Sequence, residues 1–433
     1  MILSRMSRNQ ALTSLIRSLH SRKKDNIPYV QPIRTIGIVG DRTDIKLGRV
    51  LTKFTENSYS KRILREAKNK LDLTAIHSLP LITTPSAPEI QILPATAGDY
   101  EEVVAISEGI YNGVDFLPFA YHAWLKDPQR KMLIAKSKGK VVAFESFLLV
   151  DGGMTAVVQS LRVALWMRGR GVAGIITQYL FDTLRSNHPD VTRIRFTREE
   201  NPPASILKRC RIIHSKAMVS VYLSADELEE VLRVLKSRIS SVSKDSPPPV
   251  FLDYSKVHGL FSGPLKEEDL LPGRFLIQSL LPITTCKANL DLMQRWGVQW
   301  LCSYPCDAVR RITGSSELTD VSTDGSSSKE DNDLSSSAFK GFLSLGTPMF
   351  PVPLGGGKHR LDIDLFGTDL SFAKIHVLLQ LKEAVKALPT GGSIICILYA
   401  EESLRDGLTG LFDGFTPFFW CREQLVLENR SKL

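Results

Sequence analysis

The feature that most constrains the fold is a regular alternation of strand and helix patterns between Gln91 and Leu223. Runs of alternating or continuous apolar residues predict strands at 90–93, 131–136, 141–150, 155–165, 191–197 and 215–223. Apolar residues three and four apart predict helices at 98–110, 117–126, 172–184 and 202–211. This order predicts an α/β fold with a mixed sheet of about 130 residues, which is large enough to bury its own core.

Composition divides the remaining chain into an N-terminal and a C-terminal segment. Residues 1–88 form a basic extension and linker, expected to be partly disordered, and residues 89–224 form the predicted α/β domain. Residues 225–433 begin a second apolar region, with strands predicted at 275–281, 342–345, 360–365, 393–399 and 423–427 and helices at 371–388 and 404–412. An insertion at 313–337 is rich in Ser, Asp, Glu and Thr, so it is expected to be flexible.

Charge and composition exclude several classes of protein. The net charge is +9, and six basic residues precede the first acidic residue, Asp25. This leader has the composition of a mitochondrial transit peptide, and a basic tail is the alternative. We expect a cytoplasmic protein if it is a tail, and a mitochondrial protein if it is used as a transit peptide. No apolar run approaches the roughly 18 residues of a membrane-spanning helix, and no basic stripe interleaved with aromatic residues indicates a nucleic-acid partner. The six cysteines are too sparse for a disulfide framework and show no metal spacing.

The sharpest motif is Arg168-Gly-Arg-Gly-Val-Ala173, which lies between a predicted strand and a predicted helix. Gly169 and Gly171 permit backbone conformations that a β-carbon would forbid. The helix that follows begins with unpaired N–H groups and the positive end of its dipole, which suits a pyrophosphate. A tight turn without a ligand is the alternative.

A second motif, Asn201-Pro-Pro-Ala204-Ser-Ile-Leu207, opens the next helix directly after a strand. Together the two motifs resemble the GNAT superfamily of N-acetyltransferases. The resemblance implies a splayed sheet that binds acetyl-CoA as co-substrate, without a metal. It implies that the pyrophosphate meets the backbone of Arg168, Gly169, Arg170, Gly171, Val172 and Ala173. It also implies that Leu161 and Val163 pair with the pantetheine arm, that the Leu161 amide polarises the thioester carbonyl, and that Asn201 bonds the pantetheine or the adjacent splayed backbone. An ordinary helix N-cap is the alternative role of Asn201, and it is compatible with the first.

Two positions depart from the pattern of many GNAT proteins. Lys208 stands where many relatives have a tyrosine that protonates the departing thiolate, and an exposed surface lysine is the alternative role. The fourth strand supplies no glutamate as general base. Glu145, in the apolar third strand, is the nearest substitute, and a structural salt bridge is its alternative role.

The residues around Phe144-Glu-Ser146 and the Gly-rich turn resemble the vertebrate histidine N-acetyltransferase family, which implies free L-histidine as the acceptor. Arg162 and Arg198 are candidate cations for the substrate carboxylate, and Tyr111 and Asp115 are candidate partners of the imidazole, with loop capping or core packing as the alternative. A protein lysine or N-terminus as acceptor, or a non-catalytic scaffold, remain alternatives.

The C-terminal region is predicted to be a degenerate GNAT-like domain. Its strand–helix turn, Phe366-Gly-Thr-Asp-Leu370, lacks the glycine pattern, and Asp369 would repel a phosphate. We therefore expect no acetyl-CoA at this second turn.

Overall fold

A computed structural model of the chain describes residues 89–239, 247–262, 271, 275–304, 341–419 and 421–430. The chain divides into two compact units, residues 1–84 and 85–433, and all described residues belong to the second. The predicted leader, the linker and the insertion at 313–337 lie outside the described residues. Below, "N-terminal half" means residues 89–224 and "C-terminal half" means residues 225–430.

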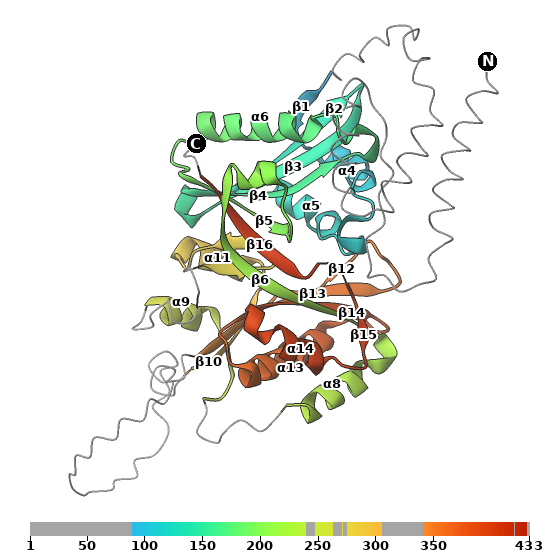
Figure 1. Ribbon diagram of the computed structural model, residues 1–433, viewed down its shortest axis with the longest axis vertical. Coiled ribbons are helices and arrows are strands. Elements are labelled where there is room, and N and C mark those ends of the chain that lie inside the picture. The colour runs from blue at the N-terminus through green and yellow to red at the C-terminus, as the bar shows by residue number, and fades with distance from the viewer. Residues whose placement is uncertain are drawn as a thin grey trace, which may run out of the picture. The chain divides into compact units, whose positions relative to one another are not determined.

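The N-terminal half follows the predicted order of elements (Figure 1). Its strands and helices are β1 (Gln91–Pro94), α4 (Tyr100–Ala105), α5 (Leu117–Leu125), β2 (Arg130–Ser137), β3 (Lys140–Val150), β4 (Thr155–Val163), α6 (Val172–Asn187), β5 (Arg193–Glu199), α7 (Ala204–Leu207) and β6 (Cys210–Leu223). Some boundaries were predicted wrongly. The helix expected at 98–110 ends at Ala105. The helix expected to reach Arg211 ends at Leu207, because β6 starts at Cys210 and pairs there with Asn429.

The C-terminal half also alternates strands and helices, and most predicted elements are confirmed. They are α8 (Leu228–Ser237), β7 (Val250–Leu252), α9 (Tyr254–Ser262), β8 (Leu276–Gln278), β9 (Leu281–Ile283), α11 (Lys287–Arg295), β10 (Gln299–Ser303), β11 (Phe342–Gly346), β12 (Phe350–Pro351), β13 (Lys358–Phe366), α13 (Leu370–Ala387), β14 (Ser393–Ala400), α14 (Arg405–Leu411), β15 (Thr416–Pro417) and β16 (Glu423–Asn429). The single strand predicted at 275–281 is instead the start of a hairpin, β8–β9, which turns at Ser279 with a left-handed φ of 54°.

One continuous sheet of 14 strands joins both halves, and most of it follows the order β1-β2-β3-β4-β5-β16-β6-β14-β13-β11-β10-β7. The C-terminal strand β16 was expected to belong with the other strands of the C-terminal half. It lies instead between β5 and β6 and pairs antiparallel with both (Figure 1). Since β5 and β6 each bond β16, the N-terminal half obtains one of its central strands from the end of the chain.

The two faces of the sheet carry different elements. Neighbouring residues of a strand point to opposite faces. On β3, Phe144 packs against Tyr121 of α5, whereas Glu145 bonds Thr177 of α6, so α5 and α6 cover opposite faces. The hairpin β8–β9 lies over β5 and β16, where the Ser279 and Leu280 carbonyls accept bonds from Gln424 and Thr197.

Removal of the Leu427 side chain should destabilise the whole unit. Leu427 of β16 is fully buried and packs with Cys210 and Phe196. A Leu→Ala change in such a core costs about 2–5 kcal/mol. Leu427→Ala should lower the urea midpoint and increase hydrogen exchange in both β5 and β6. Ile212→Ala is the control: Ile212 faces Leu427 across the strand pair, but its side chain is 47% exposed, so it should cost less than about 0.5 kcal/mol. Equal loss in both variants would contradict the role of β16.

Candidate active site

The strands β4 and β5 separate part-way along their length. Their parallel pairing covers only Thr155–Val157 against Arg193–Arg195, although β4 continues to Val163 and β5 to Glu199. On its other edge β4 pairs with β3, and a register shift opposite Glu145 goes with a left-handed φ of 63° at Ser160. Within the described residues the β4 edge beyond Val157 therefore has no partner strand, and main-chain groups near Leu161 are open to an extended ligand.

The Gly-rich turn leads from β4 into α6 and leaves the start of that helix open. Gly169 and Gly171 have φ values of 79° and 81°, and a β-carbon added to either would have no heavy atom within 4 Å. No side chain caps α6. Arg168 and Arg170 are exposed, and Arg168 Nε donates to the Val163 carbonyl at 3.0 Å. The turn thus combines free space, left-handed glycines and a positive helix end, which fits a phosphate group.

Val172 and Ala173 present only their backbone to this turn. Val172 is 1% exposed and belongs to the core below α6, and Ala173 is half-buried. Their expected contribution to a bound anion is therefore limited to main-chain N–H groups at the first turn of the helix.

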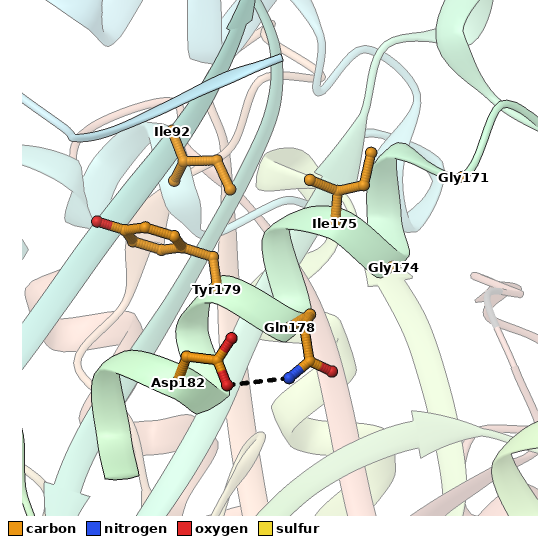
Figure 2. Close-up of a pocket in the computed structure, with 7 residues that line it drawn as sticks. All are labelled: Ile92, Gly171, Gly174, Ile175, Gln178, Tyr179 and Asp182. Atoms are coloured by element: carbon orange, nitrogen blue, oxygen red, sulfur yellow. Dashed lines mark hydrogen bonds between the residues drawn. The ribbon is translucent and has the colours of Figure 1, made fainter. Parts of the chain in front are cut away.

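A groove continues from the turn along the outer surface of α6 (Figure 2). Its volume is about 480 Å³, and it is lined by Ile92, Gly171, Gly174, Ile175, Gln178, Tyr179 and Asp182. Ile92 projects from β1 towards α6, and Gln178 donates to Asp182 at 3.0 Å. Of these residues only Gly171 was predicted from the sequence. Ile175 and Tyr179 give the groove apolar lining beside the Gly-rich turn.

On the α5 face, the loop between α4 and α5 brings three of the four predicted substrate residues together. Asp115 and Arg162 are 2% and 3% exposed and form an ion pair, with 2.5 Å between Oδ1 and Nη2. Asp115 Oδ2 and Arg162 Nε find no hydrogen-bond partner in the described chain. Tyr111 stacks on Phe116, with ring centroids 6.2 Å apart, and burial raises the pKa of Tyr111. The cluster is buried and polar, yet two of its polar atoms are unsatisfied.

Arg198, the fourth predicted residue, lies on the other face. Thr197 of β5 bonds the β8–β9 hairpin, whereas Phe196 packs with Ile206 of α7, and Arg198 shares the face of Phe196 by strand alternation. The exposed carboxylate of Glu199, next along β5, lies on the face of Thr197 and interacts electrostatically with Tyr111. Glu199 was not predicted from the sequence, because an isolated segment does not reveal which of its residues face which side of the sheet.

Glu145 lies on the α6 face, opposite the register shift in β4. It is 2% exposed, and both carboxylate oxygens accept from Thr177 Oγ1, at 3.0 and 2.9 Å. Burial raises its pKa to about 8, although the Thr177 bond opposes the shift. Among the described side chains, Glu145 bonds the Thr177 hydroxyl and no cation. Its role as general base remains a prediction.

The second motif is only partly as expected. Asn201 is exposed and has a left-handed φ of 60°. It does not cap α7, because the N-cap residue is Pro203 and no side-chain cap bond forms. The capping role was therefore predicted wrongly, while contact with acetyl-CoA remains a prediction. Lys208 is exposed, as expected of a surface lysine.

The corresponding turn of the C-terminal half is filled by the protein itself. Asp369 Oδ1 accepts from the Ser371 and Phe372 amides, at 2.8 and 3.1 Å, and so caps α13. A β-carbon on Gly367 would lie 2.6 Å from the Phe342 ring, in contrast to the open space at Gly171. A carboxylate occupies this helix start where α6 leaves room for an anion.

Comparisons with known proteins agree with this geometry. Residues 101–207 match the profile of the acetyltransferase (GNAT) family, and residues 245–318 and 330–401 match that of the histidine N-acetyltransferase C-terminal region. The histidine N-acetyltransferase of Xenopus tropicalis is 31% identical over 331 residues, covering 74% of this chain and 89% of that protein. The chain belongs to the histidine N-acetyltransferase family.

Two further relatives and one solved structure are also similar to this chain. A human protein named "Probable N-acetyltransferase 16" is 32% identical, covering 74% of this chain and 80% of that protein. The histidine N-acetyltransferase of Scomber australasicus is 28% identical, covering 75% and 89%. Among solved structures, a tandem GNAT protein from the clavulanic acid pathway aligns with a TM-score of 0.45 and 14% identity, covering 78% of this chain and 98% of that one.

The acetyltransferase is therefore an acyltransferase of the GNAT class, whose members use acetyl-CoA as co-substrate. No helix within the described ranges has the length and apolar content needed to cross a membrane. The described residues also hold no group of three or more His, Cys, Asp or Glu side chains arranged for a metal ion.

Gly171→Glu should weaken acetyl-CoA binding at least about tenfold, because a side chain at a left-handed φ costs about 1–2 kcal/mol and the carboxylate repels phosphate. Gly139→Glu is the matched control, since Gly139 also has a positive φ (77°) and free space but lies in the β2–β3 turn.

Asp369→Ala should cost about 1 kcal/mol of stability through loss of the α13 cap, with the affinity for acetyl-CoA unchanged. Titration calorimetry measures the acetyl-CoA affinity of all three variants, and urea unfolding measures the stability of Asp369→Ala. Equal weakening of acetyl-CoA binding in Gly139→Glu, or a large loss of acetyl-CoA affinity in Asp369→Ala, would contradict the placement of acetyl-CoA at the Gly-rich turn.

Proposed function

We propose that this acetyltransferase transfers the acetyl group of acetyl-CoA to the α-amine of free L-histidine. The observation that carries the proposal is the buried ion pair between Asp115, on the α4–α5 loop, and Arg162, on β4. Each of these residues has one side-chain polar atom without a hydrogen-bond partner among the described residues. The names of the relatives from Xenopus and Scomber support the same acceptor.

The acceptor's carboxylate is assigned to Arg162. Its guanidinium has one carboxylate partner, Asp115, and its Nε lacks a partner within the described residues. A buried polar atom without a partner costs about 1–3 kcal/mol, which a bound carboxylate would relieve. Asp115 Oδ2 is similarly available to an imidazole N–H, and the Tyr111–Phe116 stack supplies an aromatic wall.

The chemical step is proposed as direct transfer. Acetyl-CoA, when bound, supplies a thioester carbonyl that an amine can attack. The turn from Arg168 to Ala173 holds its pyrophosphate, Leu161 and Val163 on the open edge of β4 hold the pantetheine, and the Leu161 amide donates to the carbonyl oxygen. Asn201 is assigned to the pantetheine, and Glu145, directly or through water, to the proton of the amine.

Burial favours a small acceptor over a polypeptide. Asp115 and Arg162 are almost fully covered, so a protein lysine or N-terminus would have to bring its flanking residues into a closed space. Arg198 lies on the opposite face of the sheet, and its earlier assignment to the acceptor carboxylate is therefore kept only as the alternative to Arg162.

Thiol release with a panel of free amino acids and a lysine peptide tests the acceptor. L-Histidine should be turned over, and histamine, which lacks the carboxylate, should show a loss in kcat/KM of roughly 10- to 150-fold, the value of a hydrogen bond to a charged group. Arg162→Lys should remove most of this discrimination. Arg198→Lys is the matched control and should retain it. Equal turnover of histidine and histamine would contradict the role of Arg162, and turnover of the peptide alone would contradict the amino-acid acceptor.

The pH profile tests Glu145. If Glu145 is the base, kcat/KM should rise through pH about 8, Glu145→Gln should abolish this limb, and Thr177→Val should move it to higher pH. The pKa is 4.5 in the unfolded chain and about 8 in the fold, so stability falls as pH rises between these values. Glu145→Gln should therefore raise Tm more at pH 9 than at pH 5. A changed Tm with an unchanged rate profile would leave Glu145 a purely structural role.

A further inference from the structure

We propose that Arg360 of β13 is a positioning residue for the acceptor, which holds the loop 109–116 in its binding conformation without touching the substrate. This inference rests on the proposed function, because it assigns the acceptor to that loop. It gives the C-terminal half a part in acceptor binding that is separate from acetyl-CoA binding.

The loop 109–116 has a strained backbone conformation that needs support from neighbouring structure. Tyr111 and Asn112 both adopt left-handed conformations, with φ/ψ of 52°/36° and 55°/32°, and Gly109 and Gly113 on either side also have positive φ. Each non-glycine residue in this region costs about 1–2 kcal/mol, and an aromatic residue is rare there. Such strain survives only where neighbouring structure enforces it, and it is concentrated at functional sites.

Three segments of the C-terminal half hold three consecutive residues of the loop. Asn112 Nδ2 donates to the Phe419 carbonyl at 2.7 Å. The Leu354 amide, from the β12–β13 turn, donates to the Gly113 carbonyl at 3.0 Å. Arg360 Nη1 donates to the Val114 carbonyl, also at 3.0 Å. Asp115, the acidic partner of Arg162, comes next in the chain, so these bonds set the position of the acceptor cluster.

Among the three anchors, Arg360 alone is a buried charged group. It is 0% exposed, its Nε and Nη2 bond the two oxygens of Asp362 at 2.8 and 2.9 Å, and Nη2 also bonds Tyr399 Oη at 3.0 Å. Its donors are therefore engaged by the protein. Arg162, in contrast, keeps an unpartnered Nε within the described residues. Arg162 suits contact with substrate, and Arg360 suits support of the loop.

Only the planar fork of arginine serves this geometry. The guanidinium bonds a carboxylate with one edge and a main-chain carbonyl with another, whereas a lysine ammonium at the same site has one nitrogen and a different reach. A lysine at 360 would keep the charge opposite Asp362 but release the Val114 carbonyl. The proposal therefore predicts that charge alone is insufficient at this position.

The test uses the full chain with Arg360→Lys and Arg360→Ala. Arg405→Ala is the matched control, because Arg405 also bonds a carboxylate (Glu402) through two nitrogens and a main-chain carbonyl (Arg422) through a third, and neither partner belongs to the loop 109–116. In both Arg360 variants the KM for histidine should rise at least about tenfold, while the Kd for acetyl-CoA stays within about twofold. Millimolar guanidinium should restore part of the acceptor KM in Arg360→Ala. Arg405→Ala should leave the acceptor KM unchanged.

Hydrogen exchange separates this inference from the choice of acceptor. Amides 109–116 should exchange faster in Arg360→Lys than in wild type while β14 amides do not, and this readout needs no histidine turnover. If Arg360→Ala fails to fold, Asp362→Asn serves as the second variant, since it loosens the same guanidinium. Wild-type exchange and KM in Arg360→Lys, or parallel loss of acceptor and acetyl-CoA binding, would overturn the proposal. Failure of wild type to acetylate histidine, with faster loop exchange in Arg360→Lys, would refute the acceptor and retain the restraint.

Discussion

The separation of β4 from β5 beyond Arg195 is the constraint on which the remaining site depends. Two neighbouring strands that continue side by side would normally bond to their ends, since unpaired main-chain groups inside a sheet are costly. Here β5 gives its opposite edge to β16, and β4 changes register at the left-handed Ser160. The chain runs from the unpaired edge of β4 through the Gly-rich turn into the uncapped start of α6, so an extended thioester ligand on this path would meet main-chain groups along its arm and a helix dipole at its phosphates.

The C-terminal half shapes both sides of this gap. Through β16 it completes the sheet next to β5, and through Arg360 and its neighbours it holds the strained loop that carries Tyr111 and Asp115. A loop of the N-terminal half, which we propose as part of the acceptor site, is thus held by bonds from the C-terminal half.

What could be predicted from the sequence is what depends on local patterns. Strand and helix periods are set by neighbouring residues, and the need for glycine at a left-handed turn is local too, so the elements of the N-terminal half and the Gly169–Gly171 turn were predicted correctly. The placement of β16 depends on pairing with strands more than 200 residues earlier, as the Arg195–Glu428 separation of 233 positions illustrates. The placement of Arg198 away from Asp115 and Arg162 depends on which face of the sheet it reaches, and this phase has no signature within β5 itself. Arg360 bonds a carbonyl 246 positions away and has no local signature.

The chain contains two strand–helix turns of similar design, and their difference is electrostatic and steric rather than topological. At α6 the residues before the helix are glycines with free space and no capping side chain. At α13 the Asp369 carboxylate accepts hydrogen bonds from the Ser371 and Phe372 amides. The negative charge of this side chain therefore already compensates the positive end of the helix dipole. A phosphate at this position would have to displace the Asp369 carboxylate, which loses no translational entropy on binding because it is part of the same chain. The helix start is therefore open to a ligand in the N-terminal half and closed by a stabilising cap in the C-terminal half, whose bonds to the N-terminal half run through β16 and through the residues that hold the loop 109–116.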